Sequence, residues 1–142
     1  MSAVEYRVCY GDTDAGGVVY YAHYLRFMEM GRNDLLALLG RSIRQYQDAG
    51  IFFIVVEVNL RYRSPAGLDD RLVIETWIEE GRRSSVVFGQ RVRRKGEESF
   101  LVEGTVRVAC MNSRFRPTRL PAELRPTTGS SDAARSGTDG SE

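Results

Sequence analysis

The chain has 142 residues, which is enough for one domain with a hydrophobic core and too few for two domains of ordinary size. Its 20 basic and 19 acidic residues leave a net charge of +1, which argues against a nonspecific nucleic-acid binder. No stretch approaches the roughly 20 apolar residues that a membrane-spanning helix needs, and the N-terminus lacks the apolar run of a secretory signal.

Cysteine and histidine are too sparse to predict a metal site. His23 is the only histidine, and Cys9 and Cys110 are about a hundred positions apart, so no metal-ligand spacing is visible. Both cysteines lie in apolar, strand-like stretches, which predicts two buried free thiols rather than a disulfide. We therefore expect a reducing compartment, the cytoplasm, and no metal or redox cofactor.

The hydrophobic pattern predicts one long helix with one strand before it and four after it. In residues 4–10, apolar and polar side chains alternate as in a strand with one buried face. From about Val18 to Gly40, large apolar residues recur at three- and four-residue steps, as in a helix with one buried face. These residues are Tyr20, Tyr24, Phe27, Met28, Leu35, Leu38 and Leu39. The polar stretch that follows predicts a short helical turn or an ordered connection. Further strands are expected at residues 51–63, 71–80, 83–95 and 98–111.

These elements predict a single α+β domain over residues 1–126. Tight links at 81–82 and 95–97 make the last three strands antiparallel neighbours. The simplest two-layer arrangement for the order β-α-β-β-β-β wraps a five-stranded antiparallel sheet around one central helix. Residues 127–142 contain no aromatic or large aliphatic residue, which predicts a disordered tail. Eight residues are expected mostly in the core, with a minority lining a cavity: Trp77, Ile78, Phe88, Val92, Phe100, Val102, Val106 and Val108.

A loop rich in Gly and Asp precedes the predicted helix. Asp14 is followed by Gly16 and Gly17, which have no side chain to keep a ligand from the backbone. Backbone N–H groups at a helix start lie at the positive end of the helix dipole and can stabilise a developing oxyanion. The same residues are also ordinary turn and capping residues, and their spacing alone does not separate the two interpretations.

The string DTDAGGVVYYAHYLRFMEMGR, residues 12–32, resembles the signature of a known family. It is similar to the 4-hydroxybenzoyl-CoA thioesterase-like family of hotdog-fold proteins, and in particular to the small bacterial acyl-CoA thioesterases encoded with the Tol-Pal envelope system. The similarity runs from about residue 5 to residue 125. The resemblance implies a hotdog domain that hydrolyses an acyl-CoA to free acid and CoA, assembles as a homodimer or homotetramer and uses no cofactor.

The resemblance also implies roles for individual residues. Asp14 matches the catalytic carboxylate, which acts as nucleophile or as general base. Tyr21 matches the residue whose backbone N–H polarises the thioester carbonyl. The Tol-Pal branch usually has histidine at that position, and a phenol cannot replace an imidazole as a base at neutral pH. Residues expected to bind substrate are Tyr10, Gly16, Gly17 and Val18.

Three other polar residues in or near the motif are expected to support the site. Asp12 is interpreted as a residue that organises the loop, and His23 as a structural or surface histidine. Glu29 matches a recurrent family glutamate and is expected to form structural hydrogen bonds, although another thioesterase branch uses a helix glutamate as its catalyst.

Basic residues concentrate on three predicted strands and one hairpin turn, and arginine suits the phosphates of CoA. Two or three of them are expected to contact CoA, although a solvated strand face has the same pattern. An acidic acyl carrier protein would fit the same patch. The eight residues are Arg61, Arg63, Arg82, Arg83, Arg91, Arg93, Arg94 and Lys95.

Two rival functions remain open. A hotdog dehydratase would need a histidine base facing an acid across the site. A non-catalytic module that binds acyl-CoA or an acyl carrier would bind the ligand without releasing a thiol. The acyl chain length, the choice between aromatic and aliphatic acyl groups, and the choice between dimer and tetramer do not follow from the residues.

Overall fold

The computed structural model describes residues 1–126, and the predicted disordered tail lies outside the described residues. Within these residues the expected order β-α-β-β-β-β is confirmed, the short helical turn expected after the long helix is α2, and three 3-10 turns are added. The elements are β1 (Ser2–Arg7), η1 (Tyr10–Asp12), η2 (Tyr21–His23), α1 (Tyr24–Leu39), α2 (Ile43–Asp48), β2 (Phe52–Tyr62), β3 (Arg71–Gly81), β4 (Ser85–Arg94), β5 (Phe100–Met111) and η3 (Ala122–Leu124).

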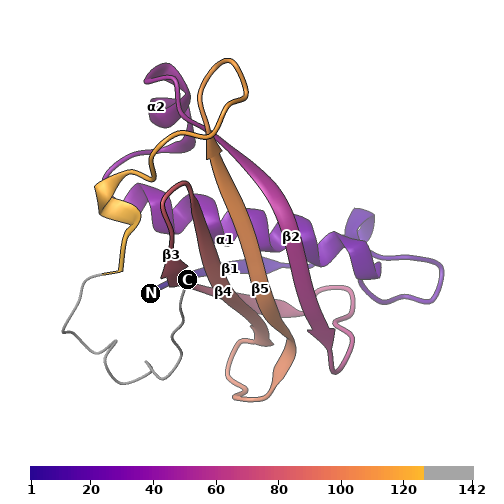
Figure 1. Ribbon diagram of the computed structural model, residues 1–142. Coiled ribbons are helices and arrows are strands. Elements are labelled where there is room, and N and C mark those ends of the chain that lie inside the picture. The colour runs from indigo at the N-terminus through magenta and orange to yellow at the C-terminus, as the bar shows by residue number, and fades with distance from the viewer. Residues whose placement is uncertain (127–142) are drawn as a thin grey trace.

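All five strands form one antiparallel sheet in the order β1-β3-β4-β5-β2. The last three strands are neighbours, as the tight links between them predict. Figure 1 shows α1 running across one face of this sheet. Strands β1 and β2 form the two edges, so the edge of β2 away from β5 leaves its backbone unpaired by any strand of residues 1–126.

The middle of α1 lies close to the sheet because position 31 is glycine. A Cβ at Gly31 would clash with Thr76 Oγ1 and would lie 2.9 Å from Ile74 Cγ2 and 3.0 Å from Gln90 Nε2. Gln90 Nε2 donates to Thr76 Oγ1 at 2.8 Å and to the Met28 carbonyl at 2.9 Å. These bonds satisfy a buried amide and fix the helix on the sheet.

The helix begins later than the periodicity predicts. Residues 18–20 are extended: the Val19 N–H donates to the Ala66 carbonyl at 2.9 Å, and Val19 also forms a β-bridge with Thr13. Hydrogen bonding to a distant loop therefore overrides the local pattern. Three of the apolar residues assigned to the buried face are exposed instead: Tyr20, Leu38 and Leu39. Gly40, with φ 136°, ends the helix as predicted.

The first strand ends at Arg7 rather than Tyr10. The chain turns at Cys9 into η1, which leaves Cys9 exposed, so the prediction of two buried thiols is wrong for this residue. Cys110 is free and buried, as predicted. Burial raises the pKa of the Cys110 thiol to about 11, so it stays protonated and unreactive at neutral pH.

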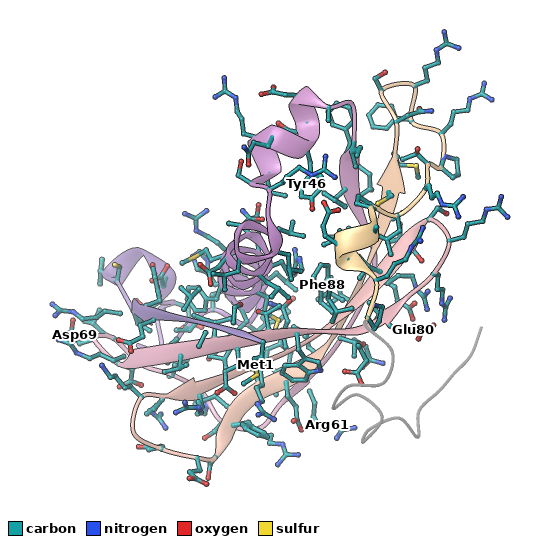
Figure 2. The ribbon with its side chains drawn as sticks, turned by 90° about the vertical axis from the view of Figure 1, so that its left-hand side faces the viewer. Met1, Tyr46, Arg61, Asp69, Glu80 and Phe88 are labelled. Carbon is teal, nitrogen blue, oxygen red and sulfur yellow. The ribbon has the colours of Figure 1, made fainter. Side chains whose placement is uncertain are left out.

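The predicted core is confirmed for Phe88, Val92, Val102, Val106 and Val108, which are all buried. In Figure 2, Phe88 lies on the side of the sheet that faces α1, and Arg61 lies on the opposite side.

The other three residues assigned to the core, Trp77, Ile78 and Phe100, are only half-buried. Trp77 covers Gly89, where a Cβ would clash with its ring, and the Arg91 guanidinium stacks between the rings of Trp77 and Phe100.

Candidate active site

The loop between β1 and η2 projects beyond the N-terminal end of α1 (Figure 1). The two arms of this loop are hydrogen-bonded to each other, and the second arm also pairs with the loop before β3. The Tyr20 N–H donates to the Asp12 carbonyl at 3.0 Å, and the Asp14 N–H donates to the Val18 carbonyl at 2.9 Å. Val18 also forms a β-bridge with Gly67. The loop is therefore a narrow hairpin whose tip contains residues 14–18.

Asp14 lies exposed at this tip, and its carboxylate is oriented by the glycines that follow. The Gly16 N–H donates to Asp14 Oδ1 at 2.8 Å, and the Gly17 N–H donates to the Asp14 carbonyl at 2.9 Å. A Cβ at Gly16 would lie 3.2 Å from Asp14 Oδ1, and Gly17 has φ +81°, a conformation that favours glycine. The two glycines thus hold a carboxylate in place without covering it.

Tyr21 is the first residue of η2, so its backbone N–H has no acceptor inside that turn. Its carbonyl accepts a hydrogen bond from the Tyr62 hydroxyl at 2.9 Å, which fixes the peptide from β2. The Tyr21 ring is exposed and packs 4.9 Å from the Tyr20 ring. Tyr62 was not anticipated, because the contact joins residues 41 positions apart.

Tyr20 is a second aromatic residue beside the carboxylate. The neighbouring Tyr21, and more weakly the charge of Asp14, raise the pKa of the Tyr20 hydroxyl. Tyr20 therefore remains protonated at neutral pH and can donate a hydrogen bond. The helical period predicts that Tyr20 is buried, whereas the structure shows that it is exposed.

The structure brings four of the six predicted site residues together, and the other two lie on either side of them in the chain. Asp14, Gly16, Gly17 and Val18 share the hairpin tip, and Tyr21 follows it after two further residues. Tyr10 lies in η1, and its side chain is 82% exposed.

Asp12 and His23 are paired beneath the loop. His23 Nε2 lies 2.9 Å from Asp12 Oδ1, and Asp12 is buried. This agrees with the interpretation of Asp12 as a loop-organising residue and gives His23 a structural partner.

A cavity of about 700 Å³ lies between α1 and the sheet strands β2, β4 and β5. Its wall starts at Ala22, the residue after Tyr21, and ends at Ile43 and Gln47 near the far end of α1. Phe88, Val106 and Val108 line it, as expected for a minority of the predicted core. The remaining lining residues are Leu25, Arg26, Glu29, Arg32, Asn33, Leu36, Ile51, Phe53, Val55 and Val58.

Arg32 and Glu29 are two of the three charged residues that line this cavity. Arg32 NH1 donates to Gln90 Oε1 at 3.1 Å; burial lowers the pKa of the guanidinium, and the charge of Glu29 opposes that shift. Glu29 is exposed and forms no hydrogen bond within residues 1–126, so the structural hydrogen bonds expected for it are not observed.

Most of the basic residues assigned to CoA are already paired with carboxylates. Six of the eight form ion pairs: Arg63 with Glu103, Arg82 with Glu80, Arg91 and Arg93 with Glu75, Arg94 with Asp70 and Glu97, and Lys95 with Glu5. Burial would raise the pKa of Glu75, but hydrogen bonds and charge from Arg91 and Arg93 lower it. Phosphates would have to compete with these acids, and which arginines contact CoA stays a prediction.

Within residues 1–126, no helix is both long and apolar enough to cross a bilayer. The same part of the chain contains no group of three or more His, Cys, Asp or Glu residues placed to hold a metal ion.

Comparison with known proteins identifies the family. Residues 16–100 match the model of the thioesterase superfamily. The acyl-CoA thioester hydrolase YbgC of Escherichia coli O157:H7 is 39% identical over 119 residues, which are 83% of this chain and 88% of that protein. The acyl-CoA thioesterase YbgC of Haemophilus influenzae is 36% identical over 121 residues, 84% of this chain and 88% of that protein.

A structural comparison gives the same family as these two sequence matches. The crystal structure of a probable thioesterase from Bartonella henselae superposes with a TM-score of 0.79 at 33% identity, covering 84% of this chain and 98% of that one. The family match and the sheet wrapped around α1 lead to one conclusion: the chain belongs to the thioesterase superfamily and has the hotdog fold.

Proposed function

We propose that the protein hydrolyses acyl-CoA thioesters, with Asp14 as the catalytic carboxylate and the Tyr21 backbone N–H as oxyanion donor. The observation that carries this proposal is the position of Asp14. Its exposed carboxylate is held by the Gly16 N–H at 2.8 Å in the loop that leads into η2 and α1. Two relatives named as acyl-CoA thioester hydrolases, each similar over most of the chain, support the substrate class.

A thioester is already activated, so its hydrolysis needs a polarised carbonyl and a nucleophile. The Tyr21 N–H donates to the carbonyl oxygen as it becomes negative. Asp14 either attacks the carbonyl carbon, expelling CoA thiolate and leaving a mixed anhydride that water cleaves, or accepts a proton from the water that attacks. No metal or redox cofactor takes part in either route, and we expect the reaction to occur in the cytoplasm.

The acyl group extends from the thioester into the cavity beside α1. Ala22 and Leu25 lie at the end of the cavity next to Tyr21, and its walls are mainly apolar. A volume of about 700 Å³ is in the range of small-molecule sites. This leaves the CoA portion outside the cavity, near the exposed loop.

A second copy of the chain completes the site. The free edge of β2 is apolar, with Ile54, Val55, Val56 and Val58 between 38% and 52% exposed. An exposed apolar edge strand invites pairing with another strand. Antiparallel pairing of two β2 edges would extend the sheet and cover the cavity wall that Val55 and Val58 form. We therefore propose at least a homodimer.

Val56→Lys is expected to convert the dimer to a monomer, because lysine on an edge strand opposes strand pairing. Light scattering after size-exclusion chromatography measures the mass. Leu68→Lys is the matched control, since Leu68 is also exposed, at 47%, but lies in the turn before β3. A Val56→Lys protein that remains dimeric would exclude the β2 edge as the interface.

Thiol release measured with acyl-CoAs of graded chain length, and with aromatic acyl-CoAs, tests the function. We expect release by the wild type with a preference for one class of acyl group. Binding without release, unchanged by Asp14→Asn, would instead favour a non-catalytic acyl-carrier or acyl-CoA binding module. The same assay with an acyl carrier protein thioester decides whether the acyl group is carried by CoA or by acyl carrier protein.

The dehydratase alternative gains no support from the geometry. His23 contacts Asp12 at 2.9 Å and does not line the cavity. It is therefore not placed to face Asp14 across a bound acyl group.

A further inference from the structure

Asp12 is the most heavily bonded side chain of the loop. It is 5% exposed and is contacted by three polar groups from three parts of the chain. The Tyr6 hydroxyl and the Cys9 N–H donate to Oδ2, each at 2.7 Å, and His23 Nε2 lies 2.9 Å from Oδ1. Both oxygens of a buried carboxylate are thus satisfied, which is the condition for burying it at low cost.

His23 reaches this carboxylate from the start of α1. It is the last residue of η2 and the N-cap residue of α1, and its ring also packs edge-on against Phe27 at 5.7 Å. The imidazole is about one-third exposed, whereas the Asp12 carboxylate is almost fully covered. The contact therefore ties the beginning of the helix to the base of the loop.

The two proposed catalytic groups lie inside the segment that this contact closes. Asp14 is two residues after Asp12, and the Tyr21 N–H is two residues before His23. The Tyr20 N–H donates to the Asp12 carbonyl at 3.0 Å, so side chain and backbone of Asp12 both hold the same junction. Any opening between Asp12 and His23 would change the separation between the carboxylate and the oxyanion donor.

We infer that His23 is a positioning residue, which through Asp12 sets the distance between Asp14 and the Tyr21 N–H. The inference rests on the proposed role of Asp14. His23 itself does not touch the substrate. Because misplacement of reacting groups by about 1 Å can cost on the order of 100-fold in rate, a contact of this kind affects turnover more than substrate binding.

His23→Ala and His23→Gln separate positioning from stability. We expect His23→Ala to lower kcat about tenfold or more with KM changed less than about threefold, because the imidazole contact with Asp12 is lost while the cavity is intact. Glutamine has an Nε2 donor of similar reach, so His23→Gln is expected to recover most of kcat. Amide hydrogen exchange at Gly16 and Gly17 should be faster in the alanine variant and close to wild type in the glutamine variant.

Glu123→Ala is the matched control at the other end of α1. Glu123 is also a carboxylate that accepts several hydrogen bonds. The Arg41 guanidinium donates to it at 2.7 and 3.0 Å, and the Tyr46 hydroxyl donates to it at 2.7 Å. Its loss should lower the Tm and leave kcat unchanged well below that temperature. An equal fall of kcat in Glu123→Ala and His23→Ala would show a general effect of stability and would overturn the inference.

The remaining outcomes distinguish this inference from the proposed function. Wild-type kcat in His23→Ala, or no recovery in His23→Gln, would overturn the positioning role while leaving Asp14 as the catalyst. A wild type that releases no thiol would contradict the proposed function instead. Hydrogen exchange at Gly16 and Gly17 would then decide the positioning role alone, with unchanged exchange in His23→Ala counting against it.

Discussion

Asp14→Asn is expected to lower kcat for thioester hydrolysis about 100- to 10,000-fold, the usual contribution of a positioned carboxylate acting as base, and at least that for a nucleophile. Asparagine keeps Oδ1 as the acceptor for the Gly16 N–H, so the loop should retain its shape. Because Asp14 is exposed, the free energy of unfolding should change by less than about 0.5 kcal/mol. Steady-state thiol release and urea unfolding measure the two effects.

Asp34→Asn serves as the control, because Asp34 lies on α1 outside the loop and the cavity lining. It should leave kcat within about twofold. Full activity of Asp14→Asn would remove the carboxylate from the mechanism.

Label in the Asp14 side chain after a single turnover in ¹⁸O-labelled water would identify Asp14 as the nucleophile. Attack by Asp14 followed by water addition at its own carbonyl leaves ¹⁸O in that side chain, whereas general-base catalysis, like water addition at the acyl carbonyl of the anhydride, puts ¹⁸O only in the product acid.

Gly31→Ala is expected to destabilise the protein by about 2 kcal/mol, although alanine favours an isolated helix by about 1 kcal/mol. The added methyl group would clash with Thr76 Oγ1 and press on Ile74 and Gln90. Overpacking of this kind costs about 3 kcal/mol when buried neighbours cannot move, so it outweighs the propensity gain. The urea midpoint should fall, and the Tm should drop by roughly 5–10 °C.

Gly11→Ala is the control for this substitution. A Cβ at Gly11 would meet no atom within 4 Å, and its φ does not fall in the left-handed region. Its stability should stay within about 0.5 kcal/mol of wild type at equal protein concentration. A Gly31→Ala protein as stable as the Gly11→Ala protein would mean that α1 can move away from the sheet at no cost.

The sheet could be predicted because its signals are local. Two short links specify which strands are neighbours, and the alternating pattern specifies their inner faces, as Val102 and Val106 illustrate. The start of α1 could not be predicted, because Val19 continues the apolar period, and its bond to Ala66, 47 positions away, together with its bridge to Thr13, makes it extended.

The candidate site could be predicted only in part, because some of its contacts join residues that are far apart in the chain. Asp14 and its glycines are adjacent in the chain and match a family motif. The bond from Tyr62 to the Tyr21 carbonyl and the cavity wall from Phe88 depend on contacts between distant strands and the helix. The exposure of Cys9 has a local cause instead. The Cys9 N–H donates to the Asp12 side chain, three residues later, and this bond turns the chain out of the strand.

The amide of Gln90 gives the long helix a single rotational register. A one-residue slip of α1 would rotate it by about 100°, which would separate Gln90 from the Met28 carbonyl and turn the charged Glu29–Arg32 side toward the apolar interior. Such a slip leaves a buried amide without one of its acceptors, which disfavours other registers of the helix. One uncharged side chain in the sheet thereby fixes the rotation of the helix that follows the Asp14 loop.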